Sequence, residues 1–212
     1  MIEALTAQYL RLEAYFRTGG VVMAPLAVVS LLMWALIVDR ALFFRALYRK
    51  NMDLDTAREH IHFRRMPDPG QYRGIVSLLV ARFLQRRSND PQLDRFILDE
   101  TVLGLNRSLD AHLAVIGVLA AVAPLLGLLG TVTGMIGTFD ILAVFGTGNA
   151  KGMAGGISEA LITTQTGLLV AIPGLYMKGF LERRARNLKQ RVARAGYYLS
   201  RHLGQFHGEE KG

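Results

Sequence analysis

The sequence predicts an all-α membrane protein with three transmembrane helices, the second and third extended into the cytoplasm, plus an N-terminal interfacial helix. The 212-residue chain is 51% apolar, and residues 21–38, 111–139 and 160–177 contain no Asp, Glu, Lys or Arg. At ~1.5 Å per helical residue, each run reaches about 27 Å or more, enough to cross a hydrocarbon core of about 30 Å. No strand pattern, nucleotide fingerprint or phosphate loop interrupts this helical reading.

A buried core helix is the alternative interpretation of any single apolar run. Three such runs in a chain of 212 residues leave too little polar sequence to wrap them all in water, so membrane insertion is favoured. The first run begins only at residue 21, behind a tail with charges of both signs, and no Ala-x-Ala exit follows it. It is therefore expected to remain as an anchor and not to act as a signal peptide.

The distribution of positive charge predicts the orientation. Residues 39–110 hold 13 of the 25 Lys and Arg residues and the tail from residue 178 holds 9, while only 3 lie elsewhere. By the positive-inside rule, the middle segment and the C-terminus are cytoplasmic, and the N-terminus and the hairpin between the last two spans are periplasmic. Topology thus explains the net charge of +8, and we expect contact with anionic lipid headgroups and no nucleic acid partner.

The expected order of segments follows from these runs and their flanks. An amphipathic helix at 1–19 is predicted by apolar residues at steps of three and four, with a frayed terminus as the alternative. The next segments are a transmembrane helix at 20–38, a cytoplasmic helical segment at 39–110, a second span at 111–145, a periplasmic hairpin at 146–156, a third span at 157–178 and a cytoplasmic helical tail at 179–212. The apolar positions of the first helix are Ile2, Leu5, Tyr9, Leu12 and Phe16.

Helix starts and stops subdivide the cytoplasmic segment. Pro67 to Gly70 form a break, and Asp90-Pro91 is typical of a helix start. No breaker separates Pro91 from the second span, and apolar residues continue at helical spacing after Met177. Both membrane helices are therefore expected to run on without interruption into the cytoplasm.

Four glycines of the second span form one stripe. At 100° per residue they fall within about 80° of the helix circumference. Aligned small residues let helices approach closely in lipid, so the stripe is predicted to be a helix-packing surface. Pro124, which removes one helix hydrogen bond, lies just before it. The glycines are Gly127, Gly130, Gly134 and Gly137.

Hydroxyl and carboxyl groups at membrane depth are candidates for moving protons. Thr131 lies beside the glycine stripe, and the third span carries Glu159, Thr163 and Thr164. Polar residues are expensive in lipid, which favours a functional role. Two alternatives remain open: threonines can satisfy a carbonyl of their own helix, and Glu159 lies near a helix start where the macrodipole favours negative charge.

The sequence offers no sign of an enzyme or a metal site. The chain has no Cys, and its five His are scattered, so no metal set is expected. A paired nucleophile and base is also lacking, and we predict neither covalent catalysis nor a cofactor.

Two stretches carry a resemblance to a known family. One runs from Ala123 to Met135 (APLLGLLGTVTGM); the other comprises 156–164 (GISEALITT) and 171–174 (AIPG). Together they resemble the ExbB/TolQ/MotA proton-channel family, and three spans with a modest cytoplasmic segment are closest to ExbB or TolQ. By position, Thr131 and Thr164 match the family's pore-lining threonines and Glu159 its third-span glutamate.

The resemblance implies an inner-membrane subunit that forms a homopentamer around the membrane helices of an ExbD-like or TolR-like partner. Proton flow through that complex would energise a TonB-like or TolA-like protein. Thr163 precedes Thr164, and Gln165 follows it, so either threonine could face the pore. A non-conducting membrane scaffold is the competing hypothesis, for which the glycine stripe alone would suffice.

The spans lack a group that titrates near their middle. Residues 111–139 and 160–177 contain no Asp, Glu or Lys, His112 lies at the cytoplasmic edge, and Asp140 and Glu159 lie toward the outer ends. Threonine hydroxyls relay hydrogen bonds but do not titrate near neutral pH. A mid-membrane carboxylate is therefore expected from another chain, in agreement with the partner aspartate that the resemblance implies.

Overall fold

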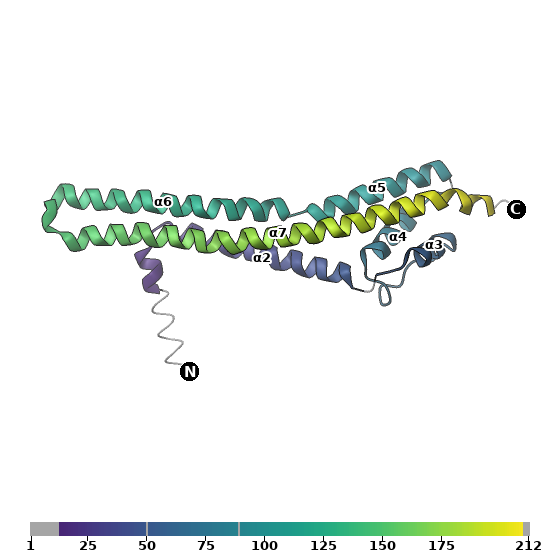
Figure 1. Cartoon of the computed structure of the whole chain (residues 1–212), viewed down its shortest axis with the longest axis horizontal. Coiled ribbons are helices and arrows are strands. Elements are labelled where there is room, and N and C mark those ends of the chain that lie inside the picture. The colour runs from purple at the N-terminus through teal and green to yellow at the C-terminus, as the bar shows by residue number, and fades with distance from the viewer. Residues whose placement is uncertain (1–12, 50, 89, 210–212) are drawn as a thin grey trace, which may run out of the picture. The chain divides into compact units, whose positions relative to one another are not determined.

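The chain is described here by a computed structural model that covers residues 13–49, 51–88 and 90–209. Within these ranges it is helical and contains no strand, which confirms the all-α prediction. A helical segment at 13–18 comes first, and residues 1–12 of the expected helix at 1–19 lie outside the described residues. The later elements are α2 (Met23–Tyr48), α3 (Leu54–His62), α4 (Ile75–Arg86), α5 (Pro91–Asp110), α6 (Leu113–Phe145), the 3-10 turn η1 (Gly146–Gly148) and α7 (Ala150–Glu209), as Figure 1 shows.

Among the described residues, three helical stretches are long and apolar enough to cross a membrane, as the apolar runs predict. They are Met23–Tyr48, Pro91–Gly148 and Ala150–Leu203. The described chain divides into two compact units. We call residues 13–37 and 114–178 the apolar unit, and residues 38–113 and 179–209 the polar unit.

The apolar unit has a small core between its three helices. Val22, Met23 and Leu26, at the start of α2, are buried together with Ala123 of α6 and Ala171 of α7. Longer apolar side chains of α6 and α7 stay exposed, as expected for helices that lie in a membrane and not in water. Among them are Leu125, Leu128, Val132, Ile136, Leu161, Leu168, Leu169 and Ile172.

The turn between α6 and α7 is shorter than the predicted hairpin at 146–156. Only η1 and Asn149 separate the helices, and Gly146 adopts a left-handed φ of 62° (Figure 1). The Asn149 side chain accepts a hydrogen bond from the backbone N–H of Gly152 at 3.0 Å. This N-cap starts α7 at Ala150, so the glycines at 152, 155 and 156 are helical.

The polar unit has a larger core built from long apolar side chains. α4 packs against α3 and α5, and α7 contributes a stripe at helical spacing. Gly196 of α7 lies so close to α5 that a Cβ there would come within 2.7 Å of a Val102 methyl carbon. The fully buried side chains include Ile61, Leu79, Phe83, Leu98, Leu105, Leu109, Leu181, Leu188, Val192 and Leu199.

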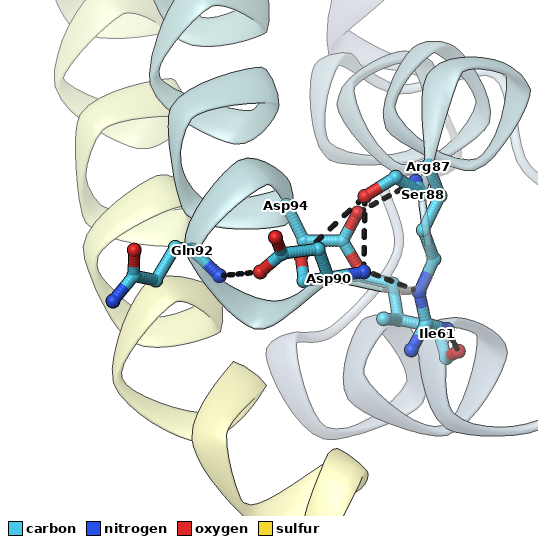
Figure 2. A network of polar contacts seen from close by, with 6 residues as sticks. All are labelled: Ile61, Arg87, Ser88, Asp90, Gln92 and Asp94. Carbon is cyan, nitrogen blue, oxygen red and sulfur yellow. Dashed lines mark hydrogen bonds and ion pairs between the residues drawn. The ribbon is translucent and has the colours of Figure 1, made fainter.

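A buried ion pair joins the end of α4 to the start of α5. Arg87 Nε lies 3.2 Å from Asp94 Oδ2, and both side chains are almost inaccessible (Figure 2). Arg87 Nη1 also donates to the Ile61 carbonyl of α3 at 2.7 Å, and Asp94 Oδ1 accepts from the Ser88 N–H at 2.7 Å. As predicted, α5 begins at Pro91, with Asp90 as its N-cap accepting from Gln92 N–H.

The predicted uninterrupted helix from Pro91 into the second span is wrong. α5 ends at Asp110, and α6 begins at Leu113 after His112, whose φ is 66°. A buried arginine of α2 holds this break: Arg40 Nη2 lies 2.7 Å from His112 Nδ1, and Nη1 donates to the Ser108 carbonyl at 3.3 Å. Arg40 therefore bonds to the Ser108 carbonyl near the end of α5 and to the His112 side chain. These bonds replace part of the backbone hydrogen bonding that is lost where the helix is interrupted. In contrast, α7 continues unbroken to Glu209 through Pro173, as expected.

Candidate functional site

The glycine stripe of α6 lies against α7 within the same chain. A Cβ added at Gly127 would lie 3.0 Å from the Thr163 carbonyl oxygen and 3.1 Å from Thr164 Cα. At Gly134 it would lie 2.6 Å from the Gly156 carbonyl oxygen. The Gly134 distance is too short for a Cβ and the Gly127 distances are tighter than most Cβ contacts, so glycine permits the two backbones to approach this closely. We call this contact the glycine seam.

Gly130 and Gly137 differ from each other in their surroundings. A Cβ at Gly130 would fall on the Thr163 side chain, so Gly130 belongs to the glycine seam. Around Gly137, no described atom lies within 4 Å of the position of a Cβ. The structure therefore brings three of the four predicted packing glycines against α7.

The α7 side of the glycine seam was missed in the sequence. Gly156 and Gly167 are as closely packed as the α6 glycines: a Cβ at Gly167 would lie 2.7 Å from the Ala123 carbonyl oxygen. The signal was present, because small residues of the third span recur at steps of three and four. They are Gly156, Ala160, Thr163, Gly167, Ala171 and Gly174.

Thr164 connects the two helices through its hydroxyl group. Its Oγ1 lies 3.2 Å from the Gly127 carbonyl oxygen of α6 and 3.2 Å from the Ala160 carbonyl oxygen of its own helix. One hydroxyl proton can serve only one of these acceptors at a time. Thr164 can therefore switch its donation between α6 and α7 without any change in backbone position.

Thr163 is fully buried in the glycine seam. Its hydroxyl group is 3.0 Å from both the Glu159 and the Ala160 carbonyl oxygens. The Thr163 side chain fills the space left by Gly130. Of the two adjacent threonines, Thr164 is the partly accessible one and Thr163 the packing residue.

Thr131 follows the ordinary pattern of a helical threonine. Its hydroxyl group donates to the Leu128 carbonyl at 2.5 Å, and the residue is partly exposed on α6. Thr138 is buried, bonds to the Gly134 carbonyl at 3.0 Å and faces Gly156. Pro124 is accommodated inside α6, which continues on both sides of it.

Glu159 lies near the start of α2. A Cβ at Gly20 would fall on the Glu159 carboxyl group, so that carboxyl group lies directly against the Gly20 backbone. Glu159 itself is partly accessible. Within the part of the chain that the structure describes, no three His, Asp or Glu side chains are grouped to hold a metal ion.

The chain has long apolar helices with exposed apolar side chains, and two of these helices are in contact through their backbones. This combination is typical of an integral membrane protein of the helical class. Residues 71–194, more than half of the chain, match the model of the MotA/TolQ/ExbB proton channel family. The chain belongs to this family and is a proton channel subunit of the ExbB/TolQ kind.

Curated relatives support the same assignment. The chain is 36% identical over 171 residues to a putative biopolymer transport protein ExbB-like 1 of Synechocystis, covering 76% of this chain and 67% of the relative. It is 42% identical over 117 residues to a biopolymer transport protein ExbB of Aquifex aeolicus, covering 54% and 76%. A Tol-Pal system protein TolQ of Haemophilus influenzae is 27% identical over 206 residues, covering 88% and 90%.

Proposed function

We propose that this chain is the multi-span subunit of a proton-driven motor in the bacterial inner membrane. In this proposal, several copies, five by the family resemblance, surround an ExbD-like single-span partner, and proton flow energises a TonB-like protein for transport across the outer membrane. The observation that carries the proposal is the Thr164 hydroxyl, which has alternative acceptors on α6 and α7. It lies in residues 160–177, which like residues 111–139 contain no Asp, Glu or Lys, so in this proposal the titrating group near the middle of the membrane comes from the partner.

The proton pathway in this proposal uses Thr131 and Thr164 to order water and the partner's carboxylate, with Glu159 toward the outer end. Thr163 supports the pathway from inside the glycine seam, where it sets the position of α7 against Gly130. Threonine hydroxyls supply hydrogen bonds and no net charge, which suits a relay group that must not trap the proton.

The division of labour between the two chains gives the central experiment. Liposomes containing the purified chain alone should leak few protons under an imposed pH gradient, and liposomes with the ExbD-like partner should conduct. Neutralising the partner's membrane aspartate should abolish this flux. Robust, Thr131-dependent flux from the single chain would contradict the proposal.

Thr164→Val tests the relay role, because valine keeps the shape of threonine without its hydroxyl group. We expect Thr164→Val and Thr131→Val, each of which removes one hydrogen-bonding hydroxyl group, to lower flux per assembled complex by up to about tenfold. Thr133→Val is the matched control: Thr133 is exposed on the same helix as Thr131 and bonds only to the Gly130 carbonyl. Equal flux in Thr131→Val, Thr164→Val and Thr133→Val complexes would remove the threonines from the pathway.

A TolQ-like role in envelope integrity is the second candidate. The match to the Haemophilus influenzae TolQ spans more of both chains than the ExbB matches. Deleting the gene and scoring both TonB-dependent uptake and detergent sensitivity would separate the two. Detergent sensitivity with normal uptake would favour the TolQ-like role.

The proposed orientation places the N-terminus and the α6–α7 turn in the periplasm and the C-terminus in the cytoplasm. Since the chain has no Cys, single cysteines at Thr6, Gly148, Ser88 and Gly204 can be labelled with an impermeant maleimide. In intact cells, the first two should react and the last two should not. Labelling of Ser88→Cys from outside would show that the orientation is the reverse of the proposed one.

A further inference from the structure

Residues 15–20, which form the end of the N-terminal helical segment and the start of its connection to α2, contact one face of α7. Gly19 lies against Ile162: a Cβ at Gly19 would be 3.3 Å from an Ile162 methyl carbon. Gly20 lies against the Glu159 carboxyl group. Tyr15 Oη is 2.8 Å from Thr166 Oγ1. Positions 159, 162 and 166 follow the three- and four-residue steps of one helix face, so a single short segment covers this face.

The direction of the Tyr15 hydrogen bond follows from the other bond of Thr166. The Thr166 hydroxyl group donates its only proton to the Ile162 carbonyl at 2.7 Å. It can therefore only accept from Tyr15, whose phenol O–H is the donor. This bond joins residues 151 positions apart and ties the segment to the middle of the third span.

Two separate features of the structure require glycine at position 20. Its φ is 66°, in the left-handed region that residues with a Cβ avoid. A Cβ would also overlap the Glu159 carboxyl oxygen and carbon. The turn is held from both sides, because Gly19 N–H donates to the Tyr15 carbonyl at 3.1 Å and Met23 N–H donates to the Gly20 carbonyl at 3.3 Å.

We propose that residues 15–20 form a cradle that positions the Glu159 carboxyl group, with Gly20 and Tyr15 as positioning residues. This inference rests on the proposed function of Glu159 in the proton pathway. Gly20 sets how closely the carboxyl group approaches α2, and Tyr15 fixes the segment onto α7 two turns further along. The N-terminal segment is thereby part of the conducting machinery and not only an interfacial anchor.

Gly20→Ala is the direct test, and the chain supplies a matched control. Gly146 has a similar left-handed φ of 62°, but no described atom lies within 4 Å of its Cβ position. Gly146→Ala therefore also places alanine at a left-handed φ, without the contact with Glu159. In liposomes containing the full chain and the ExbD-like partner, we expect Gly20→Ala to lower proton flux per assembled complex by about tenfold through misplacement of the carboxyl group. Gly146→Ala should stay close to the unmodified complex.

A second-site change separates positioning from general instability. Glu159→Asp shortens the side chain by one methylene and withdraws the carboxyl group from the added Cβ. The double variant Gly20→Ala, Glu159→Asp should therefore conduct at least as well as Gly20→Ala alone. A double variant whose loss equals the product of the two single losses would overturn the cradle, as would equal flux in Gly20→Ala and Gly146→Ala complexes.

Tyr15→Phe tests the cradle independently if complexes carrying Gly20→Ala do not assemble. It removes only the hydroxyl group, and loss of that hydrogen bond should lower flux about fivefold. Tyr197→Phe, at an exposed position of the polar unit, is its control. Unchanged flux in Tyr15→Phe complexes would overturn the role of Tyr15.

Glu159→Gln separates failure of the cradle from failure of the proposed pathway. If complexes carrying Glu159→Gln conduct normally, the proposed pathway itself is wrong. If Glu159→Gln lowers flux while Gly20→Ala and Tyr15→Phe do not, the pathway stands and only the cradle is wrong.

Discussion

The packing inside the apolar unit differs from the packing inside the polar unit. In the apolar unit, α6 and α7 meet through glycine and alanine, with backbone atoms in contact and threonines bonded to carbonyls. In the polar unit, the helices meet through leucine, isoleucine and phenylalanine and a buried Arg87–Asp94 pair. In lipid, burying an apolar side chain against another helix is not favoured by a hydrophobic effect, so van der Waals contact between closely packed helices provides the attraction. In water, the hydrophobic effect of burying large apolar side chains provides it.

The largest effect should come from breaking the buried pair of the polar unit. Asp94→Ala leaves the Arg87 guanidinium buried without its carboxylate and should lower the free energy of unfolding by about 3–5 kcal/mol. Thermal unfolding of the purified chain in mild detergent measures this. Glu100→Ala is the control, because the Arg86–Glu100 pair is solvent-exposed. Similar losses in Asp94→Ala and Glu100→Ala would show that burial does not decide the strength of these pairs.

A glycine substitution tests the apolar unit in the same way. Gly134→Leu places a side chain where a Cβ already meets the Gly156 carbonyl, so α6 and α7 must separate. We expect a loss of about 1–3 kcal/mol in the free energy of unfolding, and failure of the proposed oligomer to survive mild detergent. Gly137→Leu, on the same helix but with open space around it, should be tolerated within the chain. An intact, active oligomer carrying Gly134→Leu would mean that glycine seam contacts do not hold the apolar unit.

Arg40→Ala probes the junction between α5 and α6. It leaves His112 Nδ1 and the Ser108 carbonyl without their donor, and it removes the contact of the guanidinium with the Phe43 ring at 5.1 Å. A loss of about 1–3 kcal/mol in the free energy of unfolding is expected. Arg45→Ala, at an exposed site of the same helix, should change it by less than about 0.5 kcal/mol. Equal stability of the two variants would show that the break does not depend on Arg40.

The smallest effect concerns pH. The hydrogen bond from Tyr198 Oη to Asp55 Oδ1, 2.7 Å long, raises the pKa of Tyr198 above its ordinary value of 10.0. Because the pKa is raised in the folded chain, this contribution to stability is fully present below pH 10 and is lost as pH rises through the Tyr198 pKa. Phenolate absorbance should show a late-titrating tyrosine that Tyr198→Phe removes and Asp55→Asn moves to lower pH. An Asp55→Asn titration identical to that of the unmodified chain would contradict this assignment.

The sequence alone determined the elements whose signals are local. Charge-free runs predicted the three spans, helical spacing predicted the all-α architecture, and the periodicity of the glycines predicted three true contacts of the glycine seam. The Asp90-Pro91 start of α5 was also predictable, because capping depends on adjacent residues. Resemblance in two short stretches indicated the family.

Only the tertiary structure decided which residues meet across the chain. The break at His112 is in contact with Arg40, 72 positions away, and it could not be found in the unbroken pattern from Pro91 to the second span. The burial of Thr163 and the partial exposure of its neighbour Thr164 depend on where α6 lies. The contact of Glu159 with Gly20 likewise joins distant positions. Periodicity defines a face of a helix, but the partner of that face is chosen by packing between segments far apart in sequence.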